Sequence, residues 1–418
     1  MVSRTIPAPI SIDGLGVRKN FLEDLALKTL YLGGEMPRDE LAHHMGLSQG
    51  IVSELSQRLR KEQFCEVTGL DNSSGQFRFT TTSAGKSRAL ELLAQSQYAG
   101  PAPVSLADYV SRTNAQSVGD TLKITPSALS RAFEDLVLDT QTLNQLGTAV
   151  LSGRVLFLYG PTGTGKSIIA ETLTRLFDND DIWLPYAVEV DGQIITVYDS
   201  VLHQKVGQPP APNHDRRWVL CRRPHVVVGG ELTIEMLDLQ FNSSINYYTG
   251  PAQMKANNGL LIVDDFGRQR ISTEQLLNRW VVPLDCRIDF LTLAGGKKIE
   301  IPFDLLLVFA SNLDPAATLT DKAFLRRIQT KIKLDFATPD QFREIFRRVC
   351  LQFNLIYDAA VVDELIQMIR EEYTELLRAC YPRDIVQQIL WEARYWQKDP
   401  RLDLESVTRA CRNYFLKP

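Results

Sequence analysis

Gly160-Pro-Thr-Gly-Thr-Gly-Lys-Ser167 is the stretch that decides the fold of this 418-residue chain. It fits the pattern GxxxxGK[ST], follows an apolar run at 154–159 and precedes a helix-like segment at 168–173. Glycines allow the backbone to curl, so that successive N–H groups face a phosphate at the helix N-terminus. The alternative is a glycine-rich turn without a ligand, but both flanks and all fixed positions agree with a phosphate loop.

Every residue of this loop is a candidate nucleotide contact. Lys166 would bring positive charge to the outer phosphates of ATP or ADP, and the Ser167 hydroxyl would coordinate Mg²⁺. The complete set is Gly160, Pro161, Thr162, Gly163, Thr164, Gly165, Lys166 and Ser167. The pattern therefore predicts an α/β nucleotide-binding protein with ATP/ADP and Mg²⁺ as cofactors.

Two carboxylates end a second apolar run. Residues 260–263 read Leu-Leu-Ile-Val, and Asp264 and Asp265 follow. Ligands bind outside the carboxyl ends of the strands in open α/β sheets, so both side chains are expected beside the phosphate loop. Asp264 would hold the Mg²⁺ through water, and Asp265 would polarise the attacking water. Alone, such a strand end is most often only solvated, but beside a phosphate loop it becomes a catalytic candidate.

With these motifs in place, the chain resembles the AAA+ ATPases. The resemblance implies a parallel sheet, a helical lid over 338–418 and further polar residues at set points. A third apolar run, 305–310, leads to Asn312, which matches the sensor-one position, where an amide holds the attacking water or reads the terminal phosphate. Arg383 opens a helical segment of the lid and matches sensor two, which links the lid to the phosphates. A helix-start salt bridge is the alternative for Arg383.

The resemblance also implies an arginine finger. Residues 321–328 read as a short helix that ends in Arg326-Arg327, ahead of a strand at 331–336. In AAA+ proteins an arginine at that helix end reaches the neighbouring subunit's nucleotide, where its permanent charge stabilises phosphoryl transfer. Arg327 is the first candidate and Arg326 the second, and the alternative is that both stabilise the helix C-terminus. A finger that acts on a neighbour implies a ring oligomer, a hexamer by the resemblance.

The N-terminal part is expected to be a separate small domain. After a tail at 1–20, residues 21–96 predict three helices, two strands around a turn-rich loop at 71–75, and a further helix. That order resembles a winged helix, with Ser48 as the N-cap of the third helix. A linker is expected at 97–124, because residues 96–104 are rich in glycine, proline and polar side chains.

The nucleotide-binding domain is expected over 125–337, with two additions. Alternating runs around Gly295-Gly296 predict a β-hairpin near 285–302, as in the sigma-54-dependent activators, magnesium chelatase subunits and minichromosome maintenance helicases. The GAFTGA loop of the activators is not found in the sequence. Asp264 follows Lys166 by 98 positions, which predicts an insertion near 182–228 with extra strands and a basic surface. The basic surface would be formed by Arg216, Arg217, Arg222 and Arg223.

Composition narrows the class of protein further. The chain is 44% hydrophobic and 23% charged with a net charge of -4, which is typical of a soluble globular protein without a general attraction to nucleic acid. No apolar run approaches the length of a membrane span, so we expect no membrane insertion and a cytoplasmic protein. The cysteines lie far apart and form no CxxC pair, against a zinc ribbon or a disulfide framework. They are Cys65, Cys221, Cys286, Cys350, Cys380 and Cys411.

Three functions follow as alternatives. In the first, a ring-shaped ATPase uses lid and hairpin movements to remodel a protein client or adaptor docked through the winged helix. In the second, residues 48–88 bind DNA in an ATP-regulated transcription, replication or mobile-element factor, although residues 1–100 hold eleven basic and eleven acidic residues. In the third, the protein is a nucleotide-dependent scaffold that hydrolyses slowly, because AAA+ proteins usually carry glutamate where this chain has Asp265. The first is favoured, and the chain also resembles bacterial ATPases associated with pilus assembly.

Overall fold

A five-stranded parallel sheet lies at the centre of the computed structural model, which describes residues 5–70, 77–121, 124–178, 180–207, 213–314 and 322–416. All neighbouring strands in it run parallel. In spatial order the strands are β10 (His225–Val228), β13 (Leu260–Val263), β16 (Leu306–Ser311), β5 (Val155–Tyr159) and β17 (Thr330–Lys333). The segments that follow β5, β13 and β16 therefore meet at one edge of the sheet.

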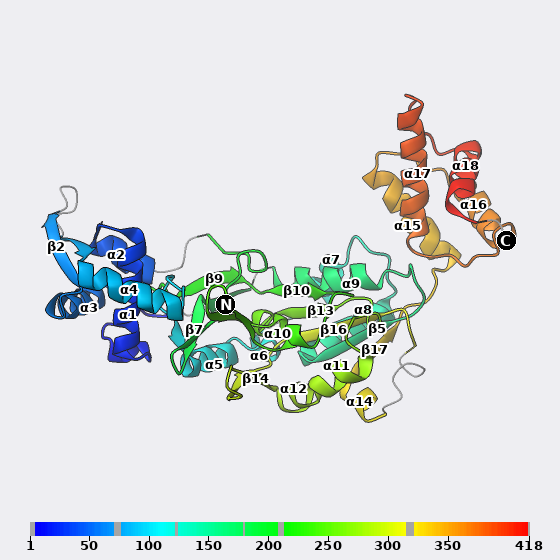
Figure 1. Ribbon diagram of the computed structural model, residues 1–418. Coiled ribbons are helices and arrows are strands. Elements are labelled where there is room, and N and C mark those ends of the chain that lie inside the picture. Colours follow the sequence, from blue (N-terminus) through cyan, green and yellow to red (C-terminus); the bar gives the residue numbers. More distant parts are fainter. Residues whose placement is uncertain are drawn as a thin grey trace.

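The two faces of this sheet bury alternate side chains. On β5, Leu156 and Leu158 belong to one apolar cluster, and Val155 and Phe157 belong to another. Helices that close the first cluster include α7 (Pro126–Ala132), α8 (Thr140–Ser152) and α9 (Lys166–Thr172). The second is closed by α11 (Thr273–Arg279), α12 (Val281–Cys286) and α14 (Lys322–Arg327). Helices thus cover both faces, as a parallel sheet requires (Figure 1).

Residues 19–95 form an N-terminal unit of four helices and a small sheet. Its elements are α1 (Lys19–Gly33), β1 (Met36–Pro37), α2 (Arg38–Met45), α3 (Gln49–Lys61), β2 (Cys65–Leu70), β3 (Phe77–Thr81) and α4 (Ser83–Gln95), with strand order β1-β3-β2. The Ser48 hydroxyl accepts a hydrogen bond from the Ile51 N–H at 3.4 Å, which caps α3. Part of the expected N-terminal tail belongs to this unit, because Leu15 and Val17 are buried in its core.

The expected linker at 97–124 is wrong, because most of it is built into the body of the protein. It contains β4 (Val104–Ser105), α5 (Leu106–Ala115) and α6 (Val118–Thr121). β4 pairs with β7 (Ala187–Val190), and Tyr109 is buried with its hydroxyl 2.8 Å from Asn257 Nδ2. The stretch resembles a linker in composition, but its few apolar side chains pack against strands that are distant in sequence.

The predicted insertion consists of strands, but the predicted range of 182–228 extends too far toward the C-terminus. β6 (Asp181–Pro185) pairs with β9 (Trp218–Arg222) as a two-stranded sheet. β10, which falls within the predicted range of 182–228, belongs instead to the central sheet. A second five-stranded sheet has the order β11 (Gln240–Asn242), β12 (Tyr247–Thr249), β8 (Gln193–Thr196), β7 and β4.

The predicted basic surface on the insertion is also wrong for two of its four arginines. Arg217 is 3% exposed and its Nη2 lies 2.8 Å from the Asp215 carboxylate. Arg223 is 4% exposed and its Nε donates to Asp180 Oδ2 at 2.9 Å. A buried guanidinium needs such a partner, because desolvation of an unpaired charge is costly. Arg217 also donates to the Leu15 carbonyl at 2.9 Å, so it ties the N-terminal segment to the body.

The predicted hairpin is present as β14 (Ile288–Thr292) and β15 (Lys298–Pro302). One face of it is packed, because Leu291 and Ile299 are buried in one cluster with Val188 and Ile195 of the second sheet, whereas Phe290 on the other face is exposed. The hairpin is therefore fixed against the inserted strands.

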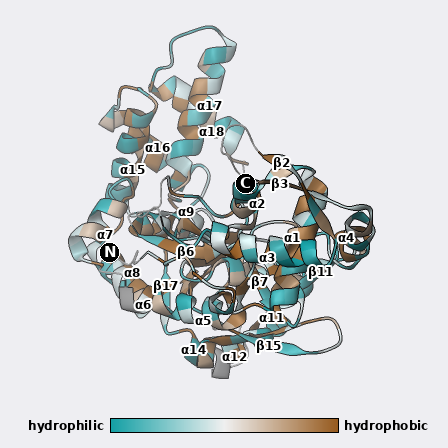
Figure 2. Ribbon diagram, turned by 90° about the vertical axis from the view of Figure 1, so that its left-hand side faces the viewer, coloured by the Kyte–Doolittle hydropathy of each residue, from teal (hydrophilic) through white to brown (hydrophobic). Residues whose placement is uncertain are grey.

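Four helices at the C-terminus form a bundle with its own apolar core. They are α15 (Pro339–Gln352), α16 (Ala359–Glu371), α17 (Tyr381–Tyr395) and α18 (Leu404–Tyr414). Thr338 and Gln341 make reciprocal hydrogen bonds that cap α15. The bundle stands apart from the sheet in both Figure 1 and Figure 2. Among the described residues, none of the helices in the chain is both long and apolar enough to cross a membrane.

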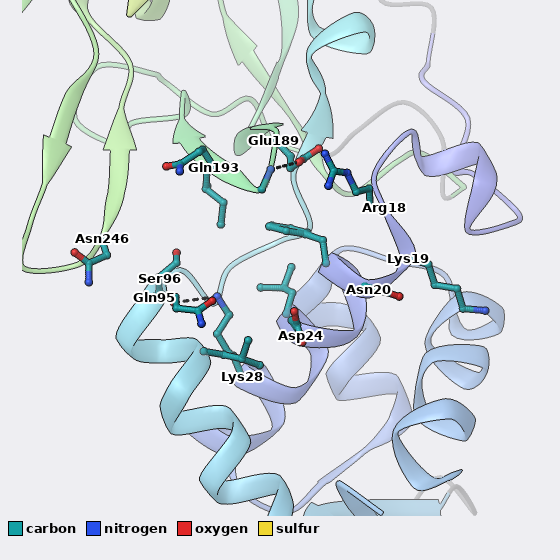
Figure 3. Close-up of a pocket in the computed structure, with 15 residues that line it drawn as sticks. Arg18, Lys19, Asn20, Asp24, Lys28, Gln95, Ser96, Glu189, Gln193 and Asn246 are labelled. Atoms are coloured by element: carbon teal, nitrogen blue, oxygen red, sulfur yellow. Dashed lines mark hydrogen bonds between the residues drawn. The ribbon is translucent and has the colours of Figure 1, made fainter. Parts of the chain in front are cut away.

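A cavity of about 700 Å³ separates the N-terminal unit from the turn between β7 and β8, and Lys28 lies in its wall (Figure 3). Lys28 is 5% exposed and its ammonium donates to the Ser96 carbonyl at 3.0 Å, just past the end of α4. Burial lowers the pKa of Lys28 to about 8, although the Asp24 carboxylate opposes this shift. The folded protein therefore carries a buried charge at neutral pH that one hydrogen bond and one nearby carboxylate offset only in part.

This shift predicts a rise in stability at alkaline pH. Between pH 8 and 10.5 the unfolded chain keeps the Lys28 proton and the folded chain has released it, so the free energy of unfolding increases with pH in this window. Across this pH window, release of the Lys28 proton raises the free energy of unfolding by about 3 kcal/mol in total. We expect urea unfolding of the wild type and Lys28→Met to differ less in midpoint at pH 10 than at pH 7, with the variant more stable at pH 7. A difference that does not change with pH would contradict this account.

Candidate nucleotide site

The phosphate loop crosses the carboxyl edge of the central sheet between β5 and α9. Gly160 begins it with a φ of 141°, and a Cβ there would lie 1.9 Å from the Leu334 carbonyl oxygen on the chain beyond β17. No side chain could occupy that space, so glycine is required by close packing as well as by conformation. The loop is thus packed against the segment that follows β17 in the same chain, before it continues into α9.

Lys166 is buried at the first position of α9 and is folded back onto its own loop. Its ammonium donates to the carbonyls of Gly160 at 3.0 Å and Pro161 at 2.6 Å. Burial lowers the pKa of Lys166, and the negative charges of Asp265 and Asp264 oppose that shift. An ammonium held only by loop carbonyls can exchange these neutral acceptors for charged phosphate oxygens, which bind it more strongly.

The carboxylates after β13 lie beside the loop, as the sequence predicts. Ser167 Oγ donates to Asp264 Oδ1 at 2.9 Å, and the Asp265 N–H donates to the same oxygen at 3.0 Å. Asn312 Nδ2, at the end of β16, donates to Asp265 Oδ1 at 2.9 Å. The hydroxyl of Ser167 and the carboxylate of Asp264 fit Mg²⁺, because this ion takes hard oxygen donors and uses few of them from protein.

Asp265 has a left-handed backbone conformation, with a φ of 48°. Aspartate tolerates this region better than most residues, and such conformations persist where the surroundings hold them. Gln269, which sequence reasoning missed, provides that support: its amide donates to the carbonyls of Asp264 at 2.8 Å and Asp265 at 3.2 Å. Its side-chain oxygen accepts from the Gly267 N–H at 2.8 Å. No motif marks a glutamine in this place, so only the folded loop reveals it.

The two predicted arginines lie away from this cluster. Arg327, at the end of α14, has its Nε 2.9 Å from both carboxylate oxygens of Asp285 on α12. These hydrogen bonds lower the pKa of Asp285. Arg383 lies exposed in the first turn of α17. The residue just before that helix, Cys380, donates its N–H to the Gly163 carbonyl at 3.1 Å, which brings the start of α17 to the phosphate loop.

The fold and this site define a class of protein. A parallel sheet has helices on both faces, a phosphate loop after one strand and paired carboxylates after another, and a C-terminal helical bundle follows. Together these make up an α/β P-loop architecture with an additional helical bundle. The fold class predicted from the sequence is confirmed in this respect.

Comparison with known proteins adds the following similarities. Residues 338–413 match a family described only as a domain of unknown function (DUF8689), and no curated protein matches the chain. NtrX from Brucella abortus in complex with ADP is 13% identical, with a TM-score of 0.41 over 67% of this chain and 56% of that one. The Thermotoga maritima RuvB Holliday junction branch migration motor is 14% identical, with a TM-score of 0.38 over 66% and 70%. Domain III of the Thermotoga maritima replication initiation protein DnaA is 14% identical, with a TM-score of 0.39 over 69% and 98%.

Proposed function

We propose that this protein is an AAA+ ATPase that binds ATP and Mg²⁺ at residues 160–167, hydrolyses the ATP in a ring oligomer and remodels or regulates a protein partner. The observation that carries the proposal is the joint placement of Ser167, Asp264, Asp265 and Asn312. Hydrogen bonds of 2.9 Å link Ser167 to Asp264 and Asn312 to Asp265, directly beside the buried Lys166. Phosphoryl transfer needs such a set of charge, metal-binding oxygens and a carboxylate that orients water.

Each residue of the set has a distinct task. Lys166 leaves the carbonyls of its own loop and binds the outer phosphates. Ser167 and Asp264 hold the Mg²⁺, which neutralises phosphate charge when bound. Asp265 orients the attacking water and accepts its proton, and the Asn312 amide fixes the direction of that carboxylate.

The N-terminal unit is proposed to be a winged helix that docks a protein client or adaptor. Three of the six basic side chains within residues 48–88 that could contact DNA phosphates are paired with carboxylates of the same unit. These pairs are Arg58–Glu23 at 3.0 Å, Arg78–Glu35 at 2.8 Å and Arg88–Glu91 at 3.1 Å. A basic side chain that is already paired offers less counterion release on DNA, and this pairing supports a protein partner over nucleic acid.

We propose that the C-terminal bundle, and not the hairpin, makes the nucleotide-dependent movement that acts on the partner. One face of the hairpin β14–β15 packs on the second sheet, whereas the bundle touches the phosphate loop through Cys380 and Gly163. The bundle can therefore respond directly to the state of the nucleotide.

Removing the lysine of the loop tests the proposal. We expect Lys166→Ala to weaken binding of fluorescent ADP and ATP by about 10- to 100-fold, because a charge-assisted contact to phosphate is lost. Lys398→Ala, which changes an exposed lysine beyond α17, is the matched control and should bind as the wild type does. Thermal unfolding without nucleotide checks that both variants fold. Absence of nucleotide binding by the wild type, or equal binding by both variants, would contradict the proposed function.

A further inference from the structure

The C-terminal end of α17 carries a cluster of exposed aromatic side chains. Trp391 is 58% exposed, Tyr395 is 78% exposed and Trp396, just beyond the helix, is 61% exposed. Trp391 and Tyr395 are four positions apart, so they are neighbours on one face of the helix. The rings of Tyr395 and Trp396 are 5.0 Å apart at their centres. The three side chains therefore form one continuous surface, which we call the aromatic surface.

The core of the bundle does not need this surface. The core-facing side chains of α17 include Ile385, Val386 and Ile389, on the side of the helix opposite Trp391. The three aromatic side chains together expose roughly 400 Å². A contiguous apolar patch of that size marks an interaction site on a protein surface. It is about half of the roughly 800 Å² that each partner gives to a standard interface, so it suits a short segment better than a second copy of the chain.

The aromatic surface is bordered by positive charge. Residues 394–401 hold three basic side chains and one acidic side chain, Asp399, and all of them are exposed. In the part of the chain that the structure describes, neither Arg394 nor Lys398 forms an ion pair. The Glu392 carboxylate is engaged inside the bundle, where it accepts from Arg409 Nε at 2.7 Å. The charge that remains available to a partner here is therefore mainly positive.

A groove lies beside the aromatic surface, between the end of α17 and the start of α18. Its volume is about 860 Å³, and Trp396, Lys398 and Arg401 lie in its wall. Binding energy concentrates where a partner's side chain fills a pocket beside aromatic residues and arginine. The groove therefore offers room for an apolar side chain, with cations at its edge for carboxylates.

This surface is distant from the nucleotide site. α17 begins beside the contact between Cys380 and Gly163 and is 15 residues long, which corresponds to about 22 Å. In Figure 1 its C-terminal end points away from the central sheet. A partner bound at the aromatic surface would thus leave the phosphate loop open.

We propose that the aromatic surface docks a short acidic segment of a protein partner. Apolar side chains of the segment pack on the three rings, and its carboxylates pair with Arg394 and Lys398. The inference goes beyond the proposed function, because it gives the bundle a docking surface of its own that works without nucleotide. A single nucleic acid strand would also combine stacking with negative charge. Asp399 and Asp403 in the wall of the groove disfavour a strand that carries a phosphate at every nucleotide.

Titration of a fluorescein-labelled peptide with the full chain, followed by anisotropy, tests the proposal. The probe is a short synthetic peptide of glutamate and leucine, compared with the same peptide carrying lysine for glutamate and with labelled oligothymidylate. We expect the acidic peptide to bind and Trp391→Ala to weaken its binding about tenfold or more. Phe290→Ala, which removes an exposed ring on β14, is the matched control and should bind as the wild type does.

Charge reversal tests the other half of the surface. Arg394→Glu is expected to weaken binding of the acidic peptide about fivefold, and the loss should shrink as salt is raised. Arg370→Glu makes the same change at an exposed position of α16 and should have little effect.

Intrinsic fluorescence locates the bound peptide. Trp183, Trp218 and Trp280 are buried, so the two exposed tryptophans among the five in the chain both belong to the aromatic surface. The acidic peptide should therefore reduce quenching of the wild type by acrylamide. In the double variant Trp391→Phe with Trp396→Phe, the peptide should leave the quenching unchanged.

Three results would overturn the inference. One is absence of acidic-peptide binding by the wild type, or equal binding by Trp391→Ala and Phe290→Ala. Another is tighter binding of oligothymidylate that is lost in Trp391→Ala, which would assign the surface to nucleic acid. The third is a smaller oligomer in Trp391→Ala, which would show that a second copy covers the surface. Lys166→Ala should bind the peptide as the wild type does, so a failure of the proposed function is seen separately. Thermal unfolding checks that each variant folds.

Discussion

Arg327→Ala is expected to lower ATP turnover per subunit by about 10³- to 10⁵-fold, the largest single loss that the proposed function predicts. The guanidinium would stabilise charge that develops on a neighbouring subunit's nucleotide, so affinity for ATP should remain unchanged. In the isolated chain Arg327 is paired with Asp285, 2.9 Å from both carboxylate oxygens, and is thus kept away from its own phosphate loop. The test is to measure ATP turnover per subunit as a function of protein concentration. The size of the oligomer is determined in parallel in ATP and in ADP.

Mixing two inactive variants separates a finger that acts on a neighbour from one that acts on its own subunit. Lys166→Ala retains the finger and Arg327→Ala retains the phosphate loop, so a mixed ring should regain part of the activity. Arg326→Ala changes an exposed neighbouring arginine and should stay near wild-type turnover. If ATP turnover is lost in Arg326→Ala and not in Arg327→Ala, Arg326 is the arginine finger. Turnover that is independent of concentration and of both arginines would exclude a finger acting between subunits.

Asp265→Asn should reduce turnover by about 10²- to 10⁴-fold, the usual contribution of a positioned general base. The substitution keeps the size of the side chain and the left-handed backbone that aspartate and asparagine both tolerate, so ATP affinity should not change. Single-turnover hydrolysis with the protein in excess over ATP measures the chemical step directly.

Asn312→Ala is the companion to this experiment. It removes the amide that donates to Asp265 Oδ1 at 2.9 Å but leaves the carboxylate in place, so a smaller loss of about tenfold is expected. Turnover of Asp265→Asn within twofold of the wild type would contradict a catalytic role. Combined with loss of assembly in Lys166→Ala, that result would favour the nucleotide-dependent scaffold.

Residues close together in sequence carried most of what could be predicted about the site. The phosphate loop, the run ending in Asp264 and the run ending in Asn312 each combine an apolar strand with a polar end, and these are local patterns. Because parallel strands end at one edge, the three ends had to meet, which is why the Ser167–Asp264 and Asp265–Asn312 contacts could be expected in advance. The spacing also indicated a hairpin and four C-terminal helices.

Contacts between distant segments could not be foreseen in the same way. Residues 97–124 resemble a linker in composition, yet Val104 and Tyr109 are buried against strands more than 70 positions away. The sequence suggests that Arg217 and Arg223 form part of a basic surface. In the structure they are buried and paired with Asp215 and Asp180. Burial depends on what packs against a side chain, and composition alone does not contain that information.

By itself, then, the sequence determined the class of fold and the chemistry at the sheet edge, because both depend on short motifs and strand ends. Only the tertiary structure decided which polar and charged groups are partners of one another. It paired Arg327 with Asp285, bonded the Gln269 amide to the Asp265 carbonyl and brought the Cys380 N–H to the Gly163 carbonyl. The physical reason is that an ion pair or a hydrogen bond needs two partners in space, and these partners lie up to 217 positions apart in the chain.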